Sequence, residues 1–87
     1  MKNNAVLELI NHDIQGDQRV MYPTDMVGFF GRRTRLREAA ESSVLESEDG
    51  MRLLKEYLSS FYHSGTEEDK DKYRAAQSAL KAWAEGN

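Results

Sequence analysis

Apolar residues recur every three or four positions along most of this chain, in four segments separated by short stretches rich in glycine and serine. That spacing is typical of helices that bury one face. It predicts helices over about residues 4–15, 24–46, 48–62 and 67–85. We therefore expect an all-α fold, a compact bundle of four short helices, or of five if the second segment is interrupted.

Residues that can cap a helix precede each segment. Asn3 or Asn4 can cap the first helix, Thr24 the second and Ser47 the third. Thr66 begins the clearest signal, a capping box in which an aspartate stands at the fourth position. These signals support helix starts close to the positions that the apolar spacing gives.

The first segment allows another interpretation. Residues 5–10 and 18–22 could form a β-hairpin, because Pro23 favours an extended conformation in the residue before it. Residues 5–10 do not alternate cleanly between apolar and polar, however, and two isolated strands are marginally stable. A helix is the preferred prediction.

The second segment contains two glycines, Gly28 and Gly31, each of which costs about 1 kcal/mol relative to alanine inside a helix. Either they allow another backbone to approach closely, or Gly31 ends one helix and another begins a few residues later. We expect a break or kink at Gly31.

The densest group of positive charge lies in the same segment, directly after two phenylalanines. Aromatic and arginine side chains dominate the energetics of many protein interfaces, and the guanidinium group pairs well with carboxylate or phosphate. The expected binding residues are Phe29, Phe30, Arg32, Arg33, Arg35 and Arg37.

Two of the four arginines could instead form ion pairs with glutamates of the same helix. Arg35 can pair with Glu38 and Arg37 with Glu41, each pair contributing about 0.2–0.5 kcal/mol. Arg32 and Arg33 have no such neighbour and are the stronger candidates for binding.

Composition fits one small helical domain over residues 1–87, with 39% hydrophobic and 31% charged residues. The chain has no cysteine, which excludes disulfides and thiolate ligands and agrees with a reducing compartment. It shows neither a secretory signal nor an apolar run that could span a bilayer. We expect a cytoplasmic protein that does not enter a membrane.

Charge is unevenly distributed along the chain. Residues 1–37 hold six basic and four acidic residues, whereas residues 38–87 hold six basic and eleven acidic ones. Most of the chain would therefore repel a nucleic-acid backbone, which makes general DNA coating a poor explanation of the arginines.

No arrangement of residues indicates catalysis, a metal or a cofactor. His12 and Asp13 are neighbours, but adjacent helical side chains point about 100° apart, so His12 is expected to be a surface residue. Neither His12 nor His63 has further ligands at a recognisable spacing. An enzyme is the least supported class.

The leading hypothesis is a small non-enzymatic binding protein, an adaptor, inhibitor or regulator whose arginine-rich helix contacts another protein with an acidic surface. A homodimer is a further candidate, because the apolar stripe of the third helix is wide. The alternative is a nucleic-acid-binding transcriptional regulator in which residues 34–43 act like the reading helix of a helix-turn-helix, although Glu38 and Glu41 suit that role poorly. The sequence leaves open whether the arginines meet carboxylates or phosphates.

Overall fold

The computed structural model describes residues 2–17, 23–60 and 66–86; for residues 17, 23–27, 29 and 30 it describes the backbone alone. Four helices account for nearly all of these residues: α1 (Asn4–Asp17), α2 (Pro23–Ser43), α3 (Glu48–Ser60) and α4 (Glu67–Gly86). The described ranges contain no strand. The predicted all-α bundle of four helices is confirmed.

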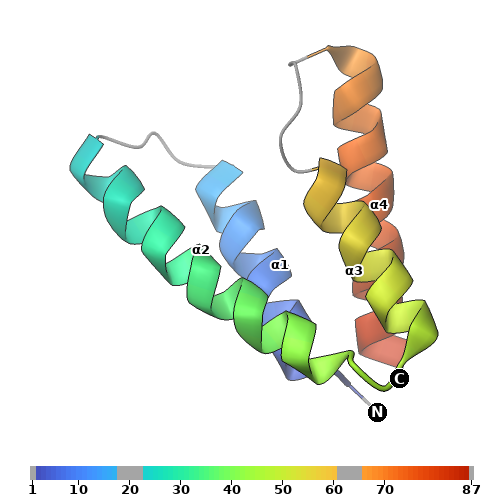
Figure 1. The fold of residues 1–87 in the computed structure, drawn as a ribbon. Coiled ribbons are helices and arrows are strands. Elements are labelled where there is room, and N and C mark those ends of the chain that lie inside the picture. Colours follow the sequence, from blue (N-terminus) through green and yellow to red (C-terminus); the bar gives the residue numbers. More distant parts are fainter. Residues whose placement is uncertain (1, 18–22, 61–65, 87) are drawn as a thin grey trace.

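The helices form two antiparallel hairpins, α1–α2 and α3–α4, which meet at one end of the molecule and diverge toward the other (Figure 1). Contacts between helices are most extensive within each hairpin, and the hairpins are joined mainly by α1 against α4. As a result α2 and α3 make few contacts with each other. The backbone spans 37 × 28 × 17 Å, so the molecule is flat.

Three of the predicted caps are confirmed. The side-chain oxygens of Asn3, Ser47 and Thr66 each accept a hydrogen bond from the backbone N–H three residues later, at 3.1, 3.1 and 3.2 Å. These bonds satisfy N–H groups that have no partner within the helix. Helix α2 begins at Pro23, one residue before the predicted cap Thr24, whose side chain lies outside the described residues.

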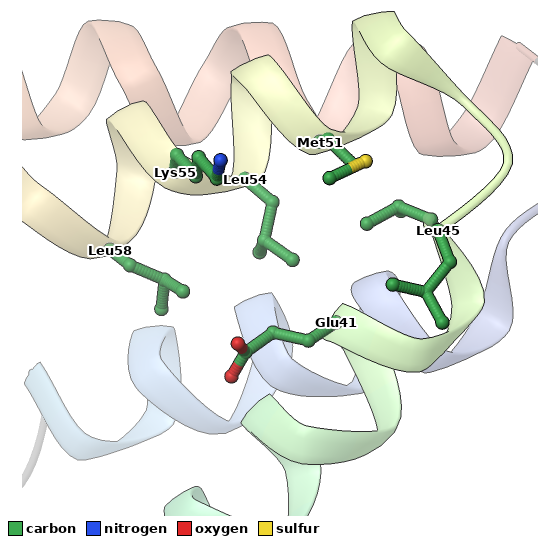
Figure 2. A pocket seen from close by; sticks show the side chains of 7 residues that line it. Glu41, Leu45, Met51, Leu54, Lys55 and Leu58 are labelled. Carbon is green, nitrogen blue, oxygen red and sulfur yellow. The ribbon is translucent and has the colours of Figure 1, made fainter.

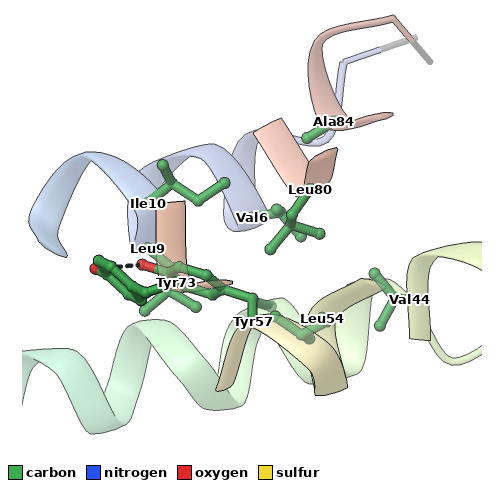
Figure 3. Close-up of a cluster of buried hydrophobic side chains, with 10 residues drawn as sticks. Val6, Leu9, Ile10, Val44, Leu54, Tyr57, Tyr73, Leu80 and Ala84 are labelled. Atoms are coloured by element: carbon green, nitrogen blue, oxygen red, sulfur yellow. Dashed lines mark hydrogen bonds between the residues drawn. The ribbon is translucent and has the colours of Figure 1, made fainter. Parts of the chain in front are cut away.

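The buried apolar side chains come from all four helices and from the turn that follows α2 (Figure 3). Burial of one large aliphatic or aromatic side chain contributes about 1.5–3 kcal/mol, so this core provides most of the driving force for folding. Its members are Val6, Leu9, Ile10, Ala40, Val44, Leu54, Tyr57, Tyr73, Leu80 and Ala84.

Two alternatives from the sequence are wrong. Residues 4–17 form α1, so residues 5–10 are not a strand of a β-hairpin; residues 18–22 lie outside the described residues. The predicted break at Gly31 is absent, because α2 continues through Gly28 and Gly31. Burial along α1 outweighs the glycine penalty, since packing contributes more to helix stability than propensity does.

Gly50, near the start of α3, is required by a close contact. A Cβ atom at this position would lie 2.6 Å from the indole of Trp83 and 3.1 Å from a methyl group of Val44. A Cβ atom at Gly28 or Gly31 would meet no described atom within 4 Å, so no backbone among the described residues approaches these two glycines closely.

Candidate binding site

The four arginines of α2 point in different directions, and Arg33 points inward. Its side chain is only 6% exposed, and its Nε donates a hydrogen bond to Oδ1 of the fully buried Asp13 at 2.9 Å. Arg33, one of the two stronger candidates for binding, is therefore buried and does not lie on the surface. The buried pair fixes α2 against α1.

Asp13 belongs to a polar network that reaches the other hairpin. Its Oδ2 accepts a hydrogen bond from the hydroxyl of Tyr57 at 2.5 Å. The hydroxyls of Tyr57 and Tyr73 lie 3.4 Å apart, their rings are stacked with centroids 5.6 Å apart, and Gln77 Nε2 donates to both oxygens (Figure 3). With Arg33, the network contains side chains from all four helices. Because both Asp13 oxygens accept hydrogen bonds from within the protein, the carboxylate is suited to joining the helices.

The environment of the network also affects tyrosine ionisation. Burial raises the pKa of Tyr57 above its ordinary value, and the hydrogen bond to Asp13 raises this pKa further. Tyr57 therefore remains a neutral hydrogen-bond donor to the carboxylate.

His12 lies beside this network. Its Nδ1 is 3.5 Å from Asp13 Oδ1, and its side chain is 10% exposed. The expectation of a surface histidine that points away from Asp13 is therefore wrong. No group of three or more potential metal ligands exists among the described residues.

Arg32 and Arg35 are exposed, and neither forms an ion pair or hydrogen bond with another described residue. The side chains stand three residues apart on the helix and are therefore neighbours on its surface. Gly28 and Gly31, each four residues earlier, lie on the same side and leave the backbone bare. We call this surface, formed by Gly28, Gly31, Arg32 and Arg35, the arginine face.

A shallow depression between α1 and α2 adjoins the arginine face. Polar side chains from α1 supply hydrogen-bonding groups on one side, and Arg32 lies on the other. The depression is lined by Glu8, Asn11, His12, Gln15, Arg32 and Leu36.

The other predicted binding residues have different surroundings. Arg37 Nε lies 3.3 Å from Glu41 Oε1, which confirms that predicted ion pair, and both side chains are about half exposed. The pair predicted between Arg35 and Glu38 is not formed. The side chains of Phe29 and Phe30 lie outside the described residues.

An apolar groove lies between α2 and α3 (Figure 2). It encloses about 100 Å³ and has Leu45 near one end and Leu58 near the other. Leu45 is 67% exposed and is the one exposed large hydrophobic residue in the described part of the chain. The groove is lined by Glu41, Val44, Leu45, Met51, Leu54, Lys55 and Leu58.

The inward positions of Asp13 and Arg33 could have been noticed in the sequence. Asp13 follows Leu9 by four residues and Ile10 by three, and Arg33 precedes Leu36 by three, so both stand at positions of the buried stripes. Their pairing with each other and with Tyr57 depends on how the helices are placed in space.

Comparisons with protein-family models, with curated proteins and with solved structures returned no match to this chain. None of the helices in the described ranges is long and apolar enough to cross a lipid bilayer.

Proposed function

We propose that this chain is a small non-enzymatic binding protein, an adaptor or inhibitor that engages an acidic surface of another protein through its arginine face. The observation that carries this proposal is the pair Arg32 and Arg35, which are exposed side by side without a carboxylate partner among the described residues. Two neighbouring guanidinium groups can each form a bidentate contact with a carboxylate.

The position of these arginines on α2 supports recognition. A helix held in place by buried contacts presents its side chains in a fixed direction, which reduces the entropy lost on binding. Gly28 and Gly31 leave room for close approach beside both guanidinium groups. Exposed ion pairs contribute little by themselves, but a charge pair that loses its water in an interface contributes more.

An acidic protein surface is a better match than a nucleic acid. Residues 38–87 carry about five negative charges more than positive ones, and these would oppose a long phosphate backbone. A local basic face on an acidic molecule instead orients the encounter with a partner of opposite local charge.

The test compares the double variant Arg32→Glu/Arg35→Glu with the control Arg52→Glu/Arg74→Glu, which changes the charge equally at exposed positions of α3 and α4. We expect affinity capture from the native host to recover a protein partner with the unchanged chain and with the control, but not with the Arg32/Arg35 variant. Both variants should keep the helical circular dichroism spectrum. Arg33 is left unchanged because its substitution would test folding.

Retention of the partner by the folded Arg32/Arg35 variant would contradict the proposal. Titration with DNA and RNA at two salt concentrations tests the nucleic-acid alternative. If the unchanged chain binds nucleic acid tightly with a steep salt dependence, and the Arg32/Arg35 variant does not, the arginine face binds phosphate groups and not an acidic protein surface.

A further inference from the structure

We infer that the apolar groove between α2 and α3 is the surface through which two copies of this chain form a dimer, related by a twofold axis that runs along the groove. The first observation is the apolar surface itself. Leu45 is 67% exposed at one end, and Met51, Leu54 and Leu58 line the α3 side (Figure 2). Covering one leucine side chain contributes about 1.5–3 kcal/mol, and a dimer covers two copies of the groove.

The second observation is the charge on the two sides of the groove. Glu41 extends from α2, and Lys55 lies opposite on α3 (Figure 2). No ion pair joins these two side chains, and Lys55 has no ion pair with any described residue. Glu41 is half exposed and pairs with Arg37 of its own helix, an exposed pair that leaves carboxylate surface open to a second cation. Each copy therefore offers a carboxylate on one side of the apolar floor and an ammonium group on the other.

A twofold axis along the groove makes these charges complementary. Rotation about that axis places the α2 side of one copy over the α3 side of the other, so Glu41 faces the partner's Lys55, and the same contact occurs twice. An axis across the groove would instead place α2 over α2, with the two Glu41 carboxylates on the same side of the interface. Charge thus favours the first arrangement over the second.

The available surface is sufficient for a dimer. An interface of standard size buries about 800 Å² on each partner, which is roughly an eighth of the 5964 Å² that this chain exposes. In the close-up of the groove, α2 and α3 lie in front of α1 and α4, and the lining side chains lie between α2 and α3 (Figure 2). A face of this flat molecule can provide that area.

The dimer would leave the arginine face accessible. Glu41 follows Arg32 by nine residues, which at 100° per residue places the two on opposite sides of α2. Dimerisation would therefore present two arginine faces in one particle and increase avidity for a partner with repeated acidic sites. The inference does not depend on the proposed function, because it concerns other residues and a different measurement.

The test uses charge reversal and mixing, measured by sedimentation velocity and native mass spectrometry. We expect the unchanged chain to dimerise, and Glu41→Lys and Lys55→Glu each to weaken dimerisation about tenfold or more, because each variant creates two like-charge contacts. An equimolar mixture of the two variants should form a heterodimer, since both contacts then join opposite charges.

Two controls carry similar charge changes away from the groove. Glu56, the neighbour of Lys55 on α3, points about 100° away from it and does not line the groove. Glu56→Lys breaks an exposed ion pair with Arg52, much as Glu41→Lys breaks the pair with Arg37. Lys72→Glu lies on α4 and is exposed. Both controls should dimerise like the unchanged chain. Leu45→Ser, at an exposed position, should weaken dimerisation while the circular dichroism spectrum stays helical.

Four results would each overturn the inference, and the first three concern dimerisation itself. The first is that the unchanged chain remains monomeric at every concentration tested. The second is that an equimolar mixture of the two charge variants stays monomeric although each variant is folded. The third is that the control variants weaken dimerisation as much as the groove variants do. Binding of an amphipathic helical peptide to a groove that does not dimerise would likewise overturn it and assign the groove to another protein.

Discussion

The buried pair of Asp13 and Arg33 should have the largest effect on stability of any single polar contact in the described structure. Asp13→Leu removes a carboxylate that is 0% exposed and leaves the Arg33 guanidinium, 6% exposed, without the acceptor of its 2.9 Å hydrogen bond. Removing one partner of a buried ion pair costs about 3–5 kcal/mol. The hydroxyl of Tyr57 also loses its acceptor. Native domains are stable by only about 5–15 kcal/mol, so this variant should lie close to unfolding.

A double-mutant cycle tests this reasoning, with urea unfolding followed by circular dichroism. Arg33→Met strands the Asp13 carboxylate and should also destabilise, whereas Asp13→Leu combined with Arg33→Met removes both charges. Replacing both partners by apolar residues is often close to neutral. The double variant should therefore lose at least about 2 kcal/mol less than the sum of the single variants. Single losses under about 1 kcal/mol, or additive losses, would show that the pair is not buried as described.

Two further predictions concern packing and ionisation. Gly50→Ala should destabilise by about 1–3 kcal/mol because the new methyl group overlaps the indole of Trp83. Gly31→Ala should stabilise by about 0.5–1 kcal/mol, because its Cβ atom would meet no described atom within 4 Å. Urea unfolding measures both changes, and the reverse order would contradict the packing. Above about pH 10 the unfolded chain loses the Tyr57 proton and the folded chain keeps it, because burial raises the pKa of Tyr57. The free energy of unfolding should therefore be unaffected by this group below pH 10 and fall above it, by at most about 1.4 kcal/mol per pH unit. Tyr57→Phe should lack this part of the fall, and identical slopes from pH 9 to 11 would contradict the assignment.

The helices themselves could be predicted because their signals are local. Ser47 and Thr66 act through bonds to backbone groups three residues away, and the apolar spacing within each helix is visible in a short window. The break predicted at Gly31 was wrong because a local signal, the low helix propensity of glycine, was outweighed by contacts with another helix. A propensity of about 1 kcal/mol is local, but the packing of α2 along α1 that outweighs it is not.

The polar network could not be predicted from the sequence in the same way. By default, charged residues are expected at the surface because they are rarely fully buried, and neither Asp13 nor Arg33 was predicted to lie in the core. Their positions on the apolar stripes were a signal against that default, but the contact joins residues 20 apart, and Tyr57 lies 44 residues from Asp13. Only the arrangement of the helices in space shows that the Asp13 carboxylate accepts hydrogen bonds from the Arg33 guanidinium and the Tyr57 hydroxyl.

The division of the arginines follows from helix geometry and links the two proposed surfaces. Adjacent residues on a helix point about 100° apart, so Arg32 and Arg33 cannot share one surface. With Arg33 held by Asp13, the rotation of α2 about its own axis is fixed. That rotation directs Arg32 and Arg35 toward one side and Glu41 toward the groove. Substitutions in the arginine face should therefore leave the groove intact, and substitutions in the groove should leave the arginine face intact. Loss of the buried pair of Asp13 and Arg33 would instead change the orientation of α2, on which both surfaces depend.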